Sequence, residues 1–294
     1  MKARPIAILP SLCTLGNALC GFAAITLTMK ALGSADAEHA MGPANVRLAG
    51  AFILLAMVLD ALDGRLARIA RATSEFGGQL DSVADAVSFG VAPAFLMSRV
   101  VVETLKGTVP ESYAGWLWIM WVCAAVYLGC TLIRLARFNV ENEHDEEAHM
   151  SFKGLPSPAA AGAIVSVVIF LATCWQHGTY PQVTVVLLWF LPVLAVVLGV
   201  LMVSNVRYEH ALNHLIRKHR PISHLVLAVL SLAGAVVLGL ALAALLWHVA
   251  LLVGFGGYVL SGPLTGLYRR WKYRGQAPPP EAEGPEEEFT SEEE

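Results

Sequence analysis

Long apolar runs alternate with short polar segments along most of this chain. A bilayer has a hydrocarbon core of about 30 Å, so a helix that crosses it needs about 20 mostly apolar residues. Runs of that length extend over Leu9–Met29, Val46–Ile69, Gln79–Val102, Trp116–Phe138, Ser157–Trp175, Val183–Ser204, Leu225–Leu245 and Trp247–Leu267. Because lipid offers backbone groups no hydrogen-bond partners, the pattern predicts an all-α bundle of about eight transmembrane helices.

The composition agrees with this pattern. Hydrophobic residues make up 56% of the 294 residues and charged residues only 15%, which is unlike an ordinary soluble domain. The formal net charge of −3 gives no indication of a nucleic-acid partner. The expected surroundings of the chain are therefore membrane lipids.

Basic residues mark one side of the predicted bundle. Cytoplasmic loops near span ends are enriched in Lys and Arg, and most basic residues of this chain fall at every second loop. They are Lys2, Arg4, Arg65, Arg68, Arg71, Arg134, Arg137, Lys153, Arg207, Arg217, Lys218, Arg220, Arg269, Arg270, Lys272 and Arg274. The opposite loops carry little beyond Arg47 and Lys106. This alternation predicts that both termini are cytoplasmic and that the chain lies in the cell (inner) membrane.

The pattern also divides the chain into segments. Residues 1–206 form a six-helix domain, a basic cytoplasmic connector follows at 207–224, and residues 225–270 add two transmembrane helices. From 271 to 294 the sequence is rich in Pro and Glu, which cannot bury a core, so we expect a disordered acidic tail.

Four carboxylates fall inside predicted membrane helices. Asp60 and Asp63 lie about one turn apart on the second span, and Asp81 and Asp85 do the same on the third. An ionised Asp at the centre of a membrane helix costs about 2.5–3.5 kcal/mol, so four of them need partners. The connection between the two spans is short, so their acidic faces can meet. Four hard oxygen donors in one place favour two divalent cations such as Mg²⁺ or Mn²⁺, the usual apparatus for displacement at phosphorus.

The spacing of these residues resembles a family signature. The segment reads Asp60-x2-Asp63-Gly64-x2-Ala67-Arg68-x8-Gly77-x3-Asp81-x3-Asp85. All eight fixed positions match the signature of the CDP-alcohol phosphotransferases, and the likeness covers roughly the first six spans. It implies transfer of a phosphatidyl group from a CDP-linked lipid to an alcohol, with release of CMP. A solute transporter lined by the same carboxylates is the alternative from another class.

The resemblance also implies roles for individual residues. Asp60, Asp63 and Asp81 would be metal ligands, and Asp85 would share the second metal and act as general base. The nucleotide would be contacted by Gly64, Arg68, Ser74 and Gly77. Gly64 permits close approach to the helix backbone, and the Arg68 guanidinium can bind diphosphate oxygens bidentately.

The first span carries two further candidates. The segment from Pro10 to Asn17 resembles the family's opening Pro-Asn-x2-Thr-x2-Asn pattern, with Ser11 in place of the first Asn. Thr14 and Asn17 would then support the nucleotide or metal site. A helix cap and an interhelical hydrogen bond are the alternative interpretation.

Three more segments resemble the membrane-embedded phosphatidylserine synthases of that family. They are Ser88–Pro93, Arg134–Asn139 and Lys153–Pro158. This likeness implies CDP-diacylglycerol and L-serine as substrates. Arg134, Arg137 and, more weakly, Asn139 are candidates for binding the serine carboxylate. Alternatively the two arginines mark the cytoplasmic boundary or bind lipid phosphate, and the acceptor is glycerol phosphate or inositol phosphate.

Small residues near the end of the chain permit close helix contact. Gly257-x3-Ser261 and Gly262-x3-Gly266 have the spacing that brings membrane helices together. The contact could form inside one chain or across a homodimer.

Overall fold

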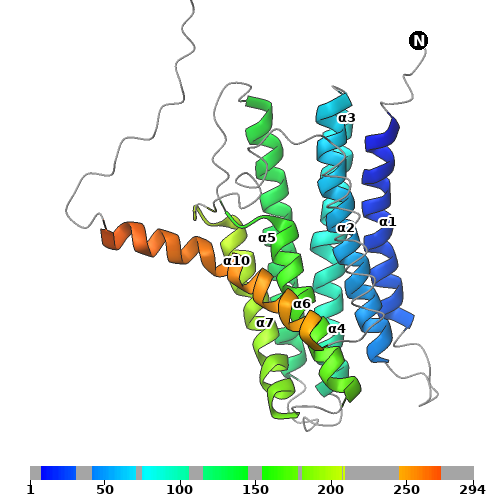
Figure 1. Cartoon of the computed structure of the whole chain (residues 1–294), viewed down its shortest axis with the longest axis vertical. Helices are drawn as coiled ribbons and strands as arrows, with labels where there is room; N and C mark the ends of the chain where they lie inside the picture. Colours follow the sequence, from blue (N-terminus) through cyan, green and yellow to red (C-terminus); the bar gives the residue numbers. More distant parts are fainter. Residues whose placement is uncertain are drawn as a thin grey trace, which may run out of the picture.

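The structure is a bundle of long helices (Figure 1). This computed structural model describes residues 8–30, 42–70, 75–105, 115–144, 154–177, 181–206, 208 and 245–272. Every regular element in these ranges is helical. Seven helical stretches are long and apolar enough to cross a membrane, which confirms the predicted all-α membrane bundle. The predicted span from 225 to 245, the connector and the acidic tail lie almost entirely outside the described residues.

The helices follow the predicted spans closely. Their bounds are α1 Ile8–Lys30, α2 Pro43–Ala70, α3 Glu75–Asp85, η3 Ala86–Val91, α4 Ala92–Leu105, α5 Gly115–His144, α6 Ser157–His177, α7 Pro181–Val203 and α10 Leu245–Lys272. The apolar stretch Gln79–Val102, predicted as one span, comprises α3, η3 and α4 in direct succession. The last predicted span, Trp247–Leu267, lies within α10.

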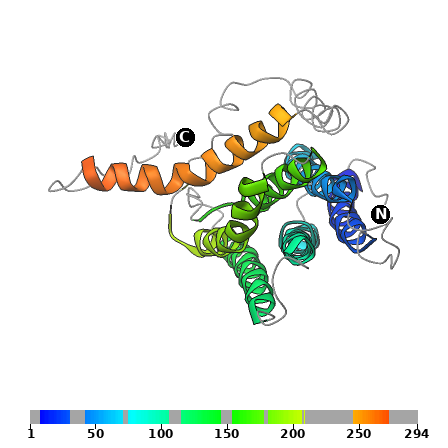
Figure 2. The same cartoon turned by 90° about the horizontal axis from the view of Figure 1, so that it is seen from below.

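One helix forms the centre of the bundle. The span in α6 is the most buried of the seven, and α6 packs against α2, α7 and α10. On the side of α2 away from α6, α1 packs along the length of α2, and α5 lies against α7 (Figure 2). An apolar helix that is buried on nearly all sides has no need of an amphipathic pattern, and α6 is apolar all round.

The stretch between α3 and α4 is a π-helix. Its last turn closes with the Ala92 N–H donating to the Val87 carbonyl, five residues back. Pro93 has no N–H, so it cannot donate to the Phe89 carbonyl as an α-helix would require. The Tyr127 hydroxyl on α5 donates to that carbonyl instead, at 2.8 Å. Pro93 therefore explains why the helix departs from α geometry here, and Tyr127 explains how a buried carbonyl is satisfied.

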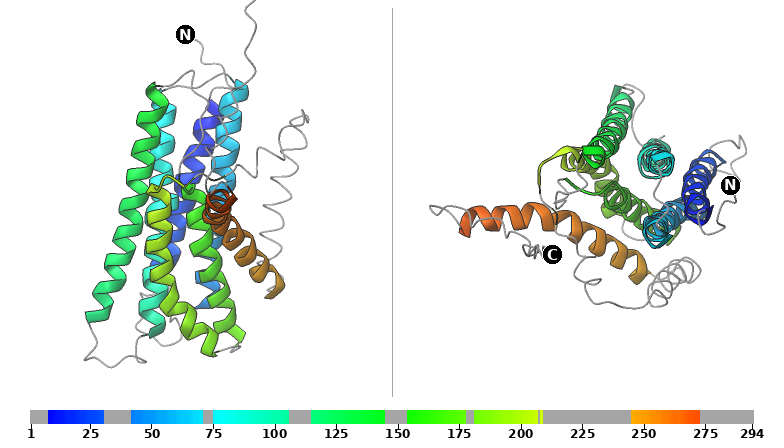
Figure 3. Two further views of the ribbon diagram at one scale, coloured as in Figure 1. Left: turned by 90° about the vertical axis from the view of Figure 1, so that its left-hand side faces the viewer. Right: turned by 90° about the horizontal axis from the view of Figure 1, so that it is seen from above.

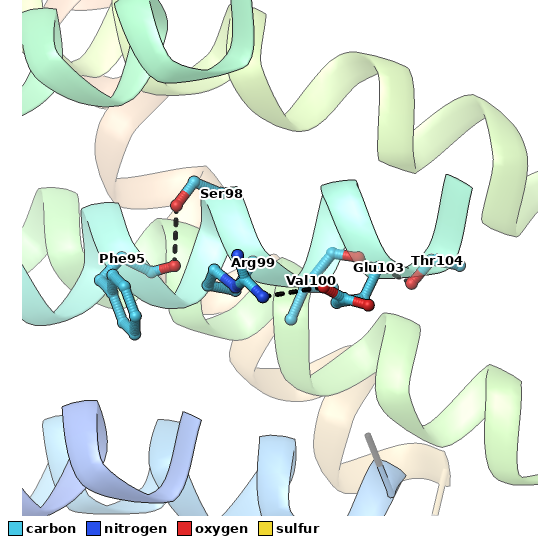
Figure 4. Close-up of polar contacts among 6 residues, drawn as sticks. All are labelled: Phe95, Ser98, Arg99, Val100, Glu103 and Thr104. Carbon is cyan, nitrogen blue, oxygen red and sulfur yellow. Dashed lines mark hydrogen bonds and ion pairs between the residues drawn. The ribbon is translucent and has the colours of Figure 1, made fainter. Parts of the chain in front are cut away.

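Polar side chains on α4 find partners on the same helix (Figure 4). Arg99 Nη2 lies 2.8 Å from Glu103 Oε1, one turn along. The hydroxyls of Ser98 and Thr104 donate to the carbonyls of Phe95 and Val100. Local pairing of this kind is what an apolar environment demands of polar groups inside a span.

The last helix crosses the bundle obliquely (Figures 1 and 3). It meets α6 at Gly162, where a Cβ would lie 2.2 Å from the Phe255 ring, so only glycine permits this approach. Further along, a Cβ on Gly262 would lie 2.5 Å from Tyr208. Burial, together with nearby Tyr258, raises the pKa of Tyr208 to about 12, and its hydroxyl donates to the Val259 carbonyl at 3.2 Å. Gly162 on α6 and Gly262 on α10 therefore allow α10 to pack closely against the rest of the chain.

Candidate active site

Three of the four motif carboxylates converge where α2 and α3 pass each other. One oxygen from each of Asp60, Asp81 and Asp85 lies within 4.8 Å of the others. The one-turn spacing of Asp81 and Asp85 places both on one face of α3, and the short connection from α2 brings Asp60 opposite them. The predicted meeting of the two acidic faces is therefore seen for these three residues.

Asp63 has a different neighbour. Its Oδ2 accepts a hydrogen bond from the Thr14 hydroxyl on α1, and the residue is buried. It stands outside the group of three carboxylates. Asp63 still interacts electrostatically with Asp60 and Asp81, so its role as a metal ligand stays a prediction.

α1 also holds Asp85. The Asn17 amide donates to Asp85 Oδ1 at 2.9 Å, and Asn17 is completely buried. The Ser88 hydroxyl in η3 donates to the Asn17 carbonyl at 2.8 Å. This contact needs Gly21, because a Cβ there would lie 2.8 Å from the Ser88 Cα. Asn17 is therefore an interhelical hydrogen-bond donor that fixes the orientation of Asp85.

The donor set suits a divalent cation. Within the described part of the chain, Asp81 Oδ1 and Asn17 Oδ1 are buried and accept no hydrogen bond. Buried acceptors of this kind are costly unless something binds them. Like charges this close also repel, and carboxylate and amide oxygens are the ligands that Mg²⁺ and Mn²⁺ prefer. The residues present therefore fit the expected cofactor, with Asp60, Asp81 and Asp85 as the residues that would hold it.

The predicted nucleotide contacts are described only in part. Gly64 is exposed, and a Cβ built there would meet nothing within 4 Å, so open space lies beside this turn of α2. Gly77 is half-buried near the start of α3. The side chain of Arg68 and all of Ser74 lie outside the described residues. Their nucleotide-binding roles stay predictions.

α5 contributes a cation to the same site. Arg134 interacts electrostatically with Asp85 and Asp60. Its Nη1 donates to the Ser157 hydroxyl at 2.7 Å, where α6 begins. Its Nε is buried and donates to none of the described residues. Arg134 is thus anchored at one nitrogen beside the carboxylates, and its role in binding serine stays a prediction.

The other two α5 candidates differ from Arg134. Arg137 is half-buried about one turn further along. Asn139 Oδ1 accepts a hydrogen bond from Ser82 of α3 at 2.9 Å, which ties α5 to the residue after Asp81. Sequence reasoning did not single out Ser82, Ser88 or Ser157 as site residues. Only Ser88 and Ser157 carried a signal, since they stand in segments that resemble the phosphatidylserine synthases.

These observations define a helical membrane protein with a cluster of carboxylates between its spans that fits a divalent cation. The CDP-alcohol phosphatidyltransferase family model matches residues 7–201, about two thirds of the chain. The chain therefore belongs to the CDP-alcohol phosphatidyltransferase family, as the signature indicated. The matched range includes all four motif carboxylates and ends before α10.

Curated relatives carry a more specific name. A CDP-diacylglycerol–serine O-phosphatidyltransferase of Mycobacterium bovis is 31% identical over 267 residues, which cover 90% of this chain and 80% of the relative. The enzyme of the same name from Bacillus subtilis is 30% identical over 70% of this chain and 92% of its own length. That of Mycobacterium leprae is 34% identical over 70% of this chain and 59% of its own length.

Proposed function

We propose that this phosphatidyltransferase transfers the phosphatidyl group of CDP-diacylglycerol to the hydroxyl of L-serine, giving phosphatidylserine and CMP. The observation that carries the proposal is the convergence of Asp60, Asp81 and Asp85 beside Arg134. The names of the relatives support serine as the acceptor.

In the proposed reaction Asp85 is the general base. Its carboxylate accepts the proton of the serine hydroxyl as the oxygen attacks the β-phosphorus of the donor. The bond from that phosphorus to the bridging oxygen breaks, and CMP leaves with the electron pair. Asn17 keeps the carboxylate oriented through its amide. The expected pair of Mg²⁺ or Mn²⁺ ions, when bound, neutralises diphosphate charge and stabilises the leaving oxygen.

The acceptor pocket is proposed to include Arg134. A serine molecule presents a carboxylate next to its hydroxyl, and a guanidinium binds a carboxylate through paired N–H donors. The contact with Ser157 holds the Arg134 side chain beside the carboxylate cluster, so the serine hydroxyl would lie near Asp85. Arg137 and Asn139 remain secondary candidates.

The proposed site opens to the cytoplasm. The N-terminal ends of α1 and α3 lie at one end of the bundle (Figure 1), and the basic residues of the chain predict that this end is cytoplasmic. CMP and serine are water-soluble, so they can exchange there. The donor reaches the site from the lipid.

Substitution of the base tests the mechanism. Asp85→Asn keeps the shape of the side chain and removes its ability to accept a proton, so turnover should fall by at least about 100-fold. Binding of CDP-diacylglycerol should change far less. The measurement is CMP release by the purified variant, with Val83→Asn, an exposed position on the same helix, as the matched control.

An acceptor screen tests the substrate. Wild-type protein is given CDP-diacylglycerol and, in turn, labelled serine, glycerol 3-phosphate or inositol phosphate. Of the three acceptors, serine should support release of CMP from the donor, and its label should appear in the lipid product. Near wild-type turnover by Asp85→Asn would refute the mechanism, and activity with glycerol 3-phosphate in place of serine would refute the acceptor.

A further inference from the structure

A partly open apolar groove of about 230 Å³ lies between α6, α7 and α10. The walls include Ala163, Val167, Phe190, Leu194, Leu252 and Gly256. Ser166 also lines it, but its hydroxyl donates to the Ala163 carbonyl at 2.8 Å. The groove therefore presents hydrocarbon surface to whatever occupies it.

The groove lies deeper in the membrane than the candidate active site. Ala163 and Val167 follow Ser157 by six and ten residues along α6, which at 1.5 Å per residue is about 9 and 15 Å further along the helix. Ser157 marks the level of the site because it accepts the hydrogen bond from Arg134. A lipid that places its diphosphate at the carboxylates has its acyl chains at the depth of the groove.

Helix α10 also lies next to both the groove and the candidate active site. Tyr258 of α10 interacts electrostatically with Arg134, and the next residue, Val259, lines the groove. One turn of α10 thus borders both the neighbourhood of Arg134 and the apolar space. This continuity favours a ligand that spans both regions.

We propose that the groove binds one acyl chain of the CDP-linked lipid donor, and that α10 provides one of its walls. The inference rests on the proposed function in taking that lipid as the donor. The family model ends at residue 201, so the α10 wall lies outside the part of the chain that it matches. The α10 wall would therefore add a contact with the donor from outside that matched domain.

Two glycines of α10 allow a controlled test. A Cβ at Gly254 or at Gly256 would meet nothing within 4 Å, so both positions have open space next to the helix backbone. Gly256 lines the groove, whereas Gly254 does not. Gly256→Leu should therefore fill the groove, and Gly254→Leu is the matched control.

The kinetic measurement is the KM for CDP-dioleoylglycerol at saturating serine. In Gly256→Leu this KM should rise by about fourfold for each methylene group displaced from the groove. The KM for a CDP-linked dihexanoyl donor, whose chains are too short to fill the groove, should stay within twofold of wild type, as should the KM for serine. Equal KM values for CDP-dioleoylglycerol in Gly256→Leu and Gly254→Leu would overturn the proposal.

Photo-crosslinking tests the groove without relying on turnover. Wild-type protein in phosphatidylcholine vesicles receives either CDP-diacylglycerol or phosphatidylcholine with a diazirine in one acyl chain. The donor should label residues 252–260 several-fold more strongly, and Gly256→Leu should lose that labelling. Equal labelling by both lipids would show a general lipid contact and overturn the assignment. If wild-type protein releases no CMP with serine, the proposed function is refuted. The comparison of labelling by the two lipids would still test whether the groove binds an acyl chain of the donor.

Discussion

The carboxylates in the site are contacted by side chains from two other helices, α1 and α5. Thr14 and Asn17 on α1 donate to Asp63 and Asp85, and Arg134 on α5 brings a positive charge to the carboxylates. Each contact comes from a helix distant in sequence from the acidic motif. The bundle therefore sets the orientation of the carboxylates, while the motif only supplies them.

Arg134→Ala tests the proposed contact with the serine carboxylate. A charge-assisted bidentate pair contributes about 1.5–3 kcal/mol, so the KM for serine should rise by about 10- to 150-fold. Lys in the same place should be a poor substitute because a point charge does not reproduce the planar fork. The measurement is initial rate against serine concentration at saturating CDP-diacylglycerol.

Ser157→Ala is the companion variant. It leaves the guanidinium charge in place but removes its anchor, so it should raise the KM for serine less than Arg134→Ala does. Arg137→Ala separates the two arginines of α5. Unchanged KM values for serine in both arginine variants would remove both residues from the acceptor pocket.

Spacing was enough to predict part of this site and too little for the rest. The period of an α-helix places Asp81 and Asp85 on one face, and the short connection brings Asp60 to them, so their meeting follows from the sequence. The bond between Thr14 and Asp63 depends on how α1 packs across a separation of 49 residues. Periodicity along one helix contains no information about such a contact.

Among the elements, η3 has the greatest effect on the site. It follows Asp85 directly and places Ser88 against Asn17 and Phe89 against Tyr127. Hydropathy predicted a single uninterrupted span here because a π-helix is as apolar as an α-helix. The signals that were present, Gly90 and Pro93, indicate a disturbed helix without specifying its type.

Tyr127→Phe tests the role of the hydroxyl that supports η3. The Phe89 carbonyl loses a buried donor, which should cost about 1–3 kcal/mol of stability. Thermal unfolding of the purified protein in detergent should show a lower Tm. The matched control is Tyr268→Phe, an exposed tyrosine on α10.

A second substitution makes this test more specific. Pro93→Ala supplies the N–H that the Phe89 carbonyl lacks, so adding it to Tyr127→Phe should recover part of the lost Tm. A Tyr127→Phe protein with the Tm of wild type would show that the hydroxyl is not needed by η3.

At the scale of the whole molecule, the hydropathy pattern predicted most of the architecture. Long apolar runs predict spans because the bilayer imposes a minimum length, and the described helices agree with seven of them. The oblique course of α10 was not predictable, since it depends on the fit of Phe255 against Gly162. Shape complementarity between distant helices leaves no trace in hydropathy.

Cysteine labelling tests the predicted orientation in the membrane. In a background without native cysteines, Ser74→Cys should react with a membrane-impermeant maleimide from the cytoplasmic side and Lys106→Cys from the opposite side. The reason is the excess of Lys and Arg on cytoplasmic loops. Both variants should first elute like wild-type protein from a size-exclusion column in detergent, which shows that they are folded. Labelling of the two positions from the same side would contradict the topology.

The hydrogen bonds from α1 also bear on how the chain enters the bilayer during its synthesis. α1 leaves the ribosome before the acidic helices α2 and α3, which follow it in the chain. Each charged Asp that enters hydrocarbon alone costs about 2.5–3.5 kcal/mol. Thr14 and Asn17 are made before Asp63 and Asp85, so α1 provides hydrogen-bond partners that ease the insertion of the acidic hairpin.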